Sequence, residues 1–542
     1  MKNNNTNLVA DVVKAACGGA KTYQSLIELG KKQSQNPEFT LWGSLTNNLS
    51  ADSFKTFTEL FPNVEAHLVD SSTVRQGESV RDVLTQYSWD AKSGKFNGVL
   101  FVSHDSLLND ALTGTLSLAN VICDEAPTSA IGLISVKNDD ITYKFIERYV
   151  QFSVCEVDSN YLIVSLKDDE DLQVELSQTI EAHTLPTGER ANFLSSHVIE
   201  LFQLLLAGYD MVYYSKGKAV VNHYFQAIKY QPAENLIKHS KSLTLLAASP
   251  ENTLFGILAQ KKLGCNFNYK TQANNVELPQ LHTHKVRIIP YLVKGNISKD
   301  LKNKVTNQAT VNREPEERHT VREDMELFAR VQLKGDFLYF VNSADEPLLP
   351  LTAAERKDKN IIRHRIMVHG LNAYKDFTKA AYIASVNPDP SERGLLKIAA
   401  KNLNLEESEL LQACITERYL ESCYQCLART IIRCHGVQTD KEIIFVVPDM
   451  RAAEYVASKF ADGYVTIDTS KGYEVLKETV KSADQKVKEL ANLAKVKAVL
   501  ADHKAKVAKL PELFKKHGMS ESTFKRTKKA HKEELQALGL IK

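Results

Sequence analysis

A run of small residues precedes a lysine and a threonine near the start of the chain. The run is Ala15-Ala16-Cys17-Gly18-Gly19-Ala20-Lys21-Thr22, between an apolar, strand-like stretch and a helical one. Small residues at such a turn let backbone N–H groups wrap an anionic phosphate at the helix N-terminus. We expect Lys21 to reach the outer phosphates of a nucleotide and the Thr22 hydroxyl to bind Mg²⁺. The alternative is a small-residue turn with an incidental Lys-Thr pair.

Two adjacent carboxylates follow a second apolar run, Val121-Ile122-Cys123. They are Asp124 and Glu125, and Ala126 and Pro127 come next. A strand that ends this way can place one acid on a magnesium ion and the other beside an attacking water. An ordinary acidic turn is the alternative. The two patterns support each other because they stand in the order, and roughly a hundred residues apart, that a nucleotide site requires.

The elements that must position these residues alternate between short apolar strands and helical stretches. Alternation of this kind predicts a parallel sheet wrapped by helices. It covers residues 1–134, returns at 241–282 and continues through 283–470. Residues 135–240 differ and read as an inserted subdomain, with an antiparallel pair over 143–157 and 161–167 and an apolar helix over 197–214. Residues 296–335 are highly charged and predict exposed helix and loop.

Composition limits the classes of protein. Of the 542 residues, 43% are hydrophobic and 25% charged, which excludes a wholly disordered chain. The net charge of +2 excludes a uniformly basic nucleic-acid coat. The sequence contains no run of about 18 apolar residues, so it predicts no membrane span. The eight cysteines lack the short regular spacings of a secreted disulfide scaffold, and the N-terminus lacks a signal peptide. We therefore expect a cytoplasmic protein, in a bacterium or a phage-infected host.

The last residues form a basic, helical tail over 471–542. Between Lys481 and Lys542 there are 16 Lys/Arg and 7 Asp/Glu. Residues 481–510 are rich in Ala, Lys and Leu and predict one long helix. Residues 510–526 resemble a helix-turn-helix with Gly518 in the turn and Ser520 capping the second helix. That helix carries the candidate DNA contacts Lys525, Arg526, Lys528 and Lys529. A charged two-helix packing element is the alternative.

With these pieces in place, an ordered set of motifs resembles the superfamily 2 (DEAD/DEAH-like) helicases. Residues 15–22 resemble AxxGxGKT, residues 42–49 the strand and "PTxxL" turn, and residues 102–107 the "THxxL" element. Asp124-Glu125-Ala126-Pro127 stands where DEAD or DEAH would, and Leu245–Pro250 resembles "SAT". In the second half, residues 337–343 resemble the fourth-motif strand and His369–Asn372 the "GxN" motif. Gln425, Arg429 and Arg433 resemble "QxxGRxGR".

The resemblance implies an α/β fold with two RecA-like parallel-sheet motor domains, an inserted subdomain and the basic helical C-terminal module. It implies ATP and Mg²⁺ as cofactors, held by Lys21, Thr22 and Asp124. Glu125, Gln425, Arg429 and Arg433 would be the catalytic residues, and Thr46, Asn47, His104 and Asn372 would contact nucleic acid. The implied function is an ATP-dependent helicase or translocase in replication or repair, of phage or mobile-element type.

The sequence departs from the family pattern at three places. Ala20 replaces the last glycine of the first motif, and Arg433 lies one residue too far from Gln425. The chain before Ala15 leaves no room for an adenine-reading Q motif, which favours a DNA or mixed-substrate enzyme. The expected partner is therefore single-stranded or forked DNA, with RNA as the alternative. A replication protein could bind the tail or the insertion. The alternatives are a non-motor replication initiator or regulator with a degenerate helicase core, and an RNA helicase.

Two further groups have ordinary explanations. Cys414, Cys423, Cys426 and Cys434 with His435 could hold zinc or an iron–sulfur cluster, but small core residues of a packed helix explain them better. His282-Thr283-His284 is expected to be an ordinary start of a strand.

Overall fold

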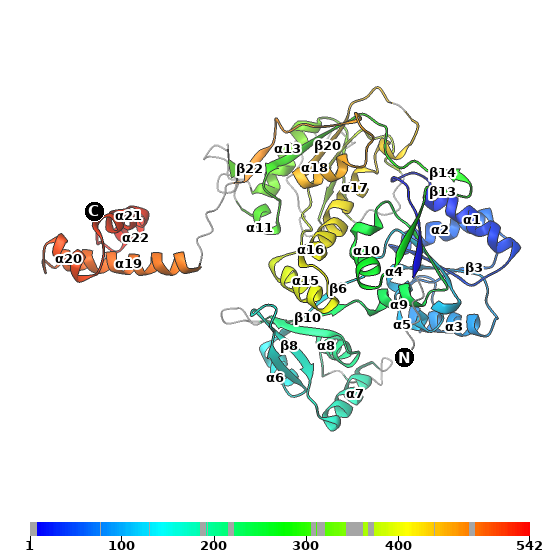
Figure 1. The fold of residues 1–542 in the computed structure, drawn as a ribbon, viewed down its shortest axis with the longest axis horizontal. Helices are drawn as coiled ribbons and strands as arrows, with labels where there is room; N and C mark the ends of the chain where they lie inside the picture. The colour runs from blue at the N-terminus through cyan, green and yellow to red at the C-terminus, as the bar shows by residue number, and fades with distance from the viewer. Residues whose placement is uncertain are drawn as a thin grey trace. The chain divides into compact units, whose positions relative to one another are not determined.

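The computed structural model describes residues 8–75, 77–128, 130–184, 191, 193–214, 222–304, 310–311, 320–342, 361–366, 373–437, 439–475 and 483–541. The chain forms two compact units, residues 1–475 and 476–542 (Figure 1). In the described part of the chain, no helix is both long and apolar enough to cross a membrane.

The first half of the larger unit is built on a seven-stranded parallel sheet. Its strand order is β12 (Asn266–Lys270), β1 (Val9–Val13), β11 (Ser242–Leu246), β5 (Asn120–Asp124), β2 (Thr40–Ser44), β4 (Val99–Ser103) and β3 (Ala66–Leu68). The strand β11 therefore lies between β1, which leads to the small-residue turn, and β5, which ends in the acidic pair. The carboxyl ends of these three strands meet at one edge of the sheet, where ligands bind in open α/β folds.

Alternating residues of these strands bury two different cores. On one face Val13, Trp42 and Phe101 pack on Leu26 and Phe57 of the helices α1 (Lys21–Gln35) and α2 (Asn47–Leu60). On the other face apolar strand residues pack on helices α3 (Val80–Lys92), α5 (Asp110–Thr113), α9 (Gln231–His239) and α10 (Leu254–Ile257). The short helix α4 (His104–Leu107) follows β4. Both faces of the sheet are covered, as the continuous apolar strands predict.

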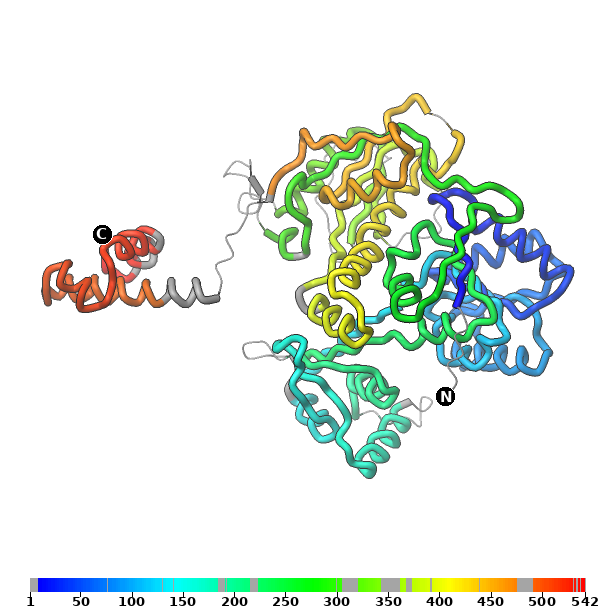
Figure 2. Tube along the Cα trace, viewed as in Figure 1, coloured from blue at the N-terminus to red at the C-terminus, as the bar shows by residue number. Residues whose placement is uncertain are grey.

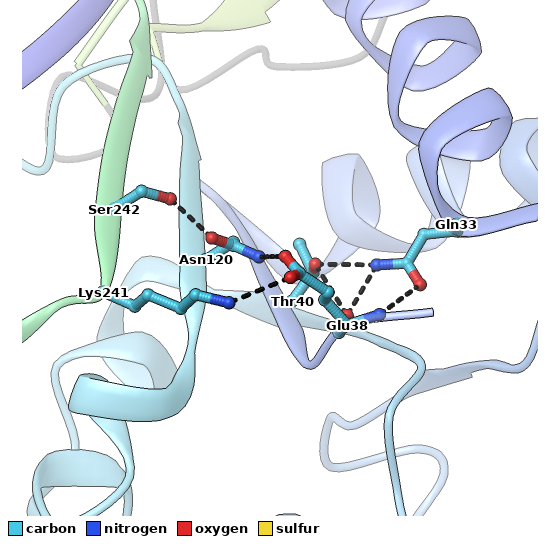
Figure 3. A network of polar contacts seen from close by, with 6 residues as sticks. All are labelled: Gln33, Glu38, Thr40, Asn120, Lys241 and Ser242. Carbon is cyan, nitrogen blue, oxygen red and sulfur yellow. Dashed lines mark hydrogen bonds and ion pairs between the residues drawn. The ribbon is translucent and has the colours of Figure 1, made fainter. Parts of the chain in front are cut away.

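A polar network ties the amino ends of three strands together (Figure 3). Glu38 accepts hydrogen bonds from Asn120 Nδ2 (2.7 Å) and Lys241 Nζ (3.0 Å), and Ser242 Oγ donates to Asn120 Oδ1 (2.8 Å). Gln33 Nε2 donates to Thr40 Oγ1 (2.9 Å). These hydrogen bonds stabilise the amino edge of the sheet, opposite the carboxyl edge where Lys21, Asp124 and Glu125 lie.

The insertion is a separate antiparallel sheet. Its order is β6 (Gly132–Asp139), β10 (Asn222–Lys229), β9 (Asp210–Tyr214), β8 (Tyr161–Leu166) and β7 (Val150–Val154), with helices α6 (Asp140–Ile146), α7 (Glu170–Thr184) and α8 (Ser196–Leu206). Two expectations were wrong in detail. Residues 140–146 are helical because Asp139 caps that helix, accepting from Thr142 N (2.7 Å). The apolar helix ends at Leu206, because Gly208 turns the chain into β9 with a left-handed φ of 76°.

The second half contains another, mainly parallel sheet. Its order is β16 (Thr310–Val311), β22 (Tyr473–Val475), β15 (Val286–Lys294), β20 (Ile443–Asp449), β19 (Lys379–Tyr382), β17 (Phe337–Val341) and β18 (Ile361–Arg365), and β21 (Val465–Ile467) also pairs with β15. A small hairpin, β13 (Gln272–Ala273) and β14 (Val276–Glu277), precedes it. Two parallel sheets, an antiparallel insertion and a helical C-terminal unit confirm the predicted fold class.

Helices of the second half cover its sheet and also reach the first half. They are α11 (Lys299–Lys302), α13 (Val321–Leu333), α15 (Pro390–Leu403), α16 (Glu407–Ile415), α17 (Glu421–Leu427) and α18 (Met450–Ala457). A π-helical turn over Thr416–Leu420 joins α16 to α17. Leu395 and Leu396 of α15 belong to the core beneath the first sheet. The expectation of exposed structure over 296–335 was wrong for α13, whose Met325 and Phe328 are buried.

The smaller unit contains α19 (Ala483–Lys504), α20 (Leu510–Lys516), α21 (Glu521–Ala530) and α22 (Lys532–Ala537), drawn in orange to red in Figure 2. The predicted helix over 481–510 ends at Lys504, because Lys506 adopts a left-handed φ of 56° and turns the chain. Val496, Leu513 and Phe524 form a core of their own. This unit is the predicted basic helical module.

Candidate functional site

The small-residue turn adopts the shape that a phosphate cradle requires. It links β1 to α1, and Ala20 caps α1 with φ 60° and ψ 16°, in the left-handed region. Gly18 is also left-handed, at φ 77°. A left-handed alanine costs roughly 1 kcal/mol more than a glycine. Ala20 therefore adopts the left-handed conformation that a glycine would adopt, at a higher conformational free energy.

The lysine and threonine after the turn are paired with the two predicted acids. Lys21 Nζ donates to Glu125 Oε1 at 2.6 Å, and Thr22 Oγ1 donates to Asp124 Oδ1 at 2.8 Å. Burial lowers the pKa of Lys21, but the charge of Glu125 outweighs it, so that pKa stays above its usual value. Burial raises the pKa of Asp124 to about 6 against the opposing charge of Lys21. A charged lysine thus faces the mouth of the turn.

Glu125 has a strained backbone. Its φ of 74° lies in the left-handed region, which a non-glycine residue adopts at a cost on the order of 1–3 kcal/mol. Its N–H bonds to the carbonyl of Leu246 at 3.2 Å, which holds the residue at the end of β5. The strained conformation is a feature typical of functional sites.

A pocket of about 460 Å³ brings the two halves of the larger unit together. The first half lines it with the turn and the acidic pair, and the second half with the helix α17 and the segment that follows. The predicted residues in its lining are Gly18, Gly19, Ala20, Lys21, Thr22, Asp124, Glu125, Gln425, Arg429 and Arg433. All the residues predicted for nucleotide binding and catalysis therefore share one pocket.

The two arginines reach this pocket from different surroundings. Arg429 is 5% exposed, and its Nε has no hydrogen-bond partner among the described residues. Burial, and then the charge of Arg433, lower its pKa. Arg433 is half-buried, ends a 3₁₀ turn, Ile431–Arg433, and lines the pocket in spite of its one-residue displacement in the sequence. Gln425 Nε2 meanwhile donates to Glu421 Oε1 (2.9 Å).

The residues present fit a magnesium ion. The Thr22 hydroxyl and the Asp124 carboxylate are hydrogen-bonded to each other at the pocket wall, so their oxygens lie side by side. Mg²⁺ takes hard oxygen ligands and completes its coordination with water and phosphate oxygens. These two groups are the ligands that such an ion would use here.

The predicted nucleic-acid contacts of the larger unit have mixed outcomes. Asn47 is exposed at the first residue of α2, and Thr46 caps that helix, accepting from Leu49 N (3.3 Å). His104 is only 2% exposed, with Gly43 beside its ring, so it does not present a surface to a strand. Asn372 lies outside the described residues.

The tail residues lie on the predicted second helix of a helix-turn-helix. Gly518 occupies the turn at φ 57°, and Ser520 caps α21, accepting from Thr523 N (3.2 Å). Phe524 points into the core of the unit. Lys525, Arg526 and Lys529 are exposed and Lys528 is half-exposed. One face of α21 therefore presents basic side chains, although Lys525 also pairs with Glu521 (2.7 Å).

Several residues near the site were not predicted. Tyr23, Asp52 and Lys375 also line the pocket. Asp52 and Lys375 lie in polar stretches that resemble any exposed surface, so no sequence signal pointed to them. His282, four residues before β15, is fully buried beside Tyr424.

Three of the four cysteines lie in packed helices. Cys414, Cys423 and Cys426 are buried in helices, and burial raises the pKa of each thiol. Within the described ranges no group of three or more His, Cys, Asp or Glu side chains could hold a metal ion.

A second cavity of about 570 Å³ shares Glu125 and Gln425 with the first pocket. Its wall includes Ala248 and Ser249 of the first half and Glu417 of the second. Glu417 is 8% exposed; its Oε2 accepts from Leu254 N (2.9 Å), and its Oε1 has no hydrogen-bond partner among the described residues. Burial raises the pKa of Glu417 to about 8.

Comparisons with known proteins give similarities of fold. No family model matches the sequence, and no curated protein matches it. A structure of the XPD helicase is 12% identical, with a TM-score of 0.47 over 85% of this chain and 96% of that chain. Xpd4 of S. tokodaii is 10% identical, with a TM-score of 0.47 over 85% and 96%. Dbp5 of S. cerevisiae, bound to RNA and ADP BeF3, is 9% identical, with a TM-score of 0.33 over 85% of each chain.

Proposed function

We propose that this chain is an ATP-dependent helicase or translocase that acts on nucleic acid, on DNA in preference to RNA. One observation carries the proposal. The lysine, hydroxyl and acid pair of the first half share a single pocket with Gln425, Arg429 and Arg433 of the second half. A pocket of this composition suits phosphoryl transfer, in which charge on the transferring group must be neutralised from several sides.

Each side chain has a distinct task in this reaction. Lys21 leaves Glu125 to neutralise the outer phosphates, and Glu125 then orients the attacking water. Arg429 stabilises charge on the transferring phosphoryl group from the opposite half. A magnesium ion held by Thr22 and Asp124 would neutralise further phosphate charge. Because the groups come from both halves, turnover depends on how the halves approach each other, and this links hydrolysis to movement along a strand.

The tail supports DNA as the substrate. A helix-turn-helix with a basic, exposed second helix suits the major groove of duplex DNA. Thr46 and Asn47, at the start of α2, are candidates for backbone contacts to a single strand. We infer that the protein loads at single-stranded or forked DNA during replication or repair, with a replication protein bound to the tail or the insertion.

A second candidate is a non-motor DNA-binding initiator or regulator with a degenerate helicase core. Ala20 favours it, because it stands in place of the last glycine of the motif and adopts a left-handed conformation that is less favourable for alanine than for glycine. An RNA helicase is the third candidate. Steady-state ATP hydrolysis measured alone and with single-stranded DNA, single-stranded RNA and duplex DNA separates the three. A DNA motor is stimulated most by DNA, and an RNA helicase by RNA. A regulator hydrolyses no ATP with any of them.

A further inference from the structure

The peptide group of Cys17, in the middle of the phosphate turn, is bonded on both sides by the second half. The Cys17 N–H donates to the Tyr424 hydroxyl oxygen at 2.9 Å. On the other side, His435 Nε2 lies 2.9 Å from the Cys17 carbonyl oxygen and donates to it. These residues are separated by about four hundred positions in the chain, so the contacts form only when the two halves are together.

Tyr424 and His435 are themselves held by a third residue. The Tyr424 hydroxyl also shares a hydrogen bond with His282 Nε2, at 2.8 Å. The rings of His282 and His435 stack with their centroids 4.8 Å apart and their planes 10° apart. Tyr424 and His282 are both 0% exposed. Burial lowers the pKa of His282 to about 3, so this histidine is neutral and can accept the hydrogen bond.

The neighbouring positions of the turn are anchored to different halves. Ala16 N donates to the carbonyl of Pro279 (2.8 Å), and Gly19 N donates to the carbonyl of Ala16 (3.0 Å). A Cβ atom on Gly18 would collide with the backbone oxygen of Arg433, so this glycine is needed for close approach as well as for its φ of 77°. The second half therefore contacts the turn at Cys17 and Gly18. Ala16 is instead held by its hydrogen bond to Pro279, which precedes the second half.

We propose that Tyr424 and His435 are positioning residues that hold the phosphate-binding turn in its working shape from the opposite half of the molecule. This inference rests on the proposed function and deepens it. A cradle of backbone N–H groups binds phosphate well only if its shape is set before the ligand arrives. Approach of the halves thus prepares the turn directly, in addition to delivering the arginines.

Packing alone does not account for Tyr424. Tyr419, five positions earlier in the same helical stretch, is equally buried, and its hydroxyl has no hydrogen-bond partner among the described residues. Tyr419 therefore shows that a tyrosine can be buried in this helix for packing alone, without a hydrogen bond to its hydroxyl. The pair provides a matched control, because each loses one buried hydroxyl on substitution by phenylalanine.

The test compares Tyr424→Phe, His435→Ala and His435→Gln with Tyr419→Phe and the wild-type protein. The first readout is amide hydrogen exchange of peptides that cover Cys17, without nucleotide. The second is the equilibrium affinity for a fluorescent, non-hydrolysable ATP analogue with Mg²⁺. We expect faster exchange and an affinity about 5- to 10-fold weaker in Tyr424→Phe and His435→Ala, the size of the one hydrogen bond to Cys17 that each variant loses. Tyr419→Phe should match the wild type in both.

His435→Gln separates positioning from general damage, because its amide can still donate to the Cys17 carbonyl. It should recover affinity to within about twofold of wild type. Unchanged exchange and affinity in Tyr424→Phe, or equal loss in Tyr419→Phe, would overturn the inference. A wild-type protein that binds no analogue refutes the proposed function instead. In that case exchange at Cys17 still decides whether the second half holds the turn.

Discussion

The nucleotide pocket and the C-terminal unit are built on opposite principles. The pocket gathers short segments that are far apart in the chain, buries Lys21, Asp124 and Arg429, and pairs Lys21 and Thr22 with the two acids. The α20–α21 pair is contiguous in the sequence, has a small core of its own and leaves its charges exposed. Changes in the pocket should therefore act through specific distances, whereas changes in the tail should act through summed charge.

The largest expected effect belongs to the pocket. Lys21→Ala should lower kcat/KM for ATP about 1000-fold, because the charge that neutralises the phosphates is removed. Glu125→Gln should lower kcat by a similar factor while ATP still binds. Rates come from a coupled ATPase assay and binding from an ATP analogue. Hydrolysis at the wild-type rate in either variant would show that the site is assigned wrongly.

The cross-half arginines come next. Arg429→Ala should lose roughly 100-fold in kcat with only a small change in nucleotide affinity, because its contact belongs to the transition state. Arg433 lies in the same pocket despite its displaced position, so Arg433→Ala should also be impaired. Steady-state kinetics on both variants check this. Full tolerance at both positions would contradict a site shared by the two halves.

The tail gives a smaller and different response. Deletion of residues 481–542 should weaken DNA binding and flatten its salt dependence by roughly 0.7–0.9 in log affinity per log salt for each lost phosphate contact. ATP hydrolysis without DNA should stay unchanged. Fluorescence anisotropy over a salt series measures the slope. An unchanged slope would mean that the tail is a partner-docking or structural element.

Charge reversal at two positions sharpens this result. Lys525→Glu together with Arg526→Glu should weaken a preferred duplex more than a random duplex if α21 reads bases. Equal weakening of both duplexes would assign α21 to phosphate contacts alone. The same anisotropy assay with two duplexes makes the distinction.

The smallest effect concerns Glu417 in the second cavity. Its folded pKa of about 8 lies above that of an unfolded glutamate, so its contribution to stability falls as the pH rises from about 4.5 to 8. The free energy of unfolding of Glu417→Gln should lack this part of the pH dependence. The difference in stability between variant and wild type should therefore shift in favour of the variant when the pH is raised from 5 to 9. Thermal unfolding midpoints at both pH values check the sign. A constant difference between the two proteins would contradict the buried, readily protonated carboxyl.

Local signals predicted the fold well where strands were continuous and apolar. β17 and β20 are fully buried, as their sequences indicate. The pattern failed at caps and reversals. Asp139 caps a helix that extends into the start of an expected strand, and Lys506 ends a helix early by adopting a left-handed φ. Where a helix begins or ends depends on single side chains and on tertiary contacts, and the periodicity of apolar residues does not reveal either.

The site was predictable to the extent that its residues belong to recognisable turns. Lys21, Asp124 and Arg429 meet in one pocket as the ordered motifs implied. His104, chosen by motif order alone, is buried. The Cys17, Tyr424, His435 and His282 network carries no sequence signal, because its hydrogen bonds join a backbone peptide to side chains far away in the chain.

The central claim is that both halves form one site for ATP, and an experimental structure with ADP, BeF3 and Mg²⁺ tests it most directly. We expect the BeF3 group beside Lys21 in the pocket of Gly18, Asp124 and Glu125, with Arg429 of the second half within hydrogen-bond distance of it. A ligand bound elsewhere, or held by the first half alone with Arg429 turned away, would contradict the account.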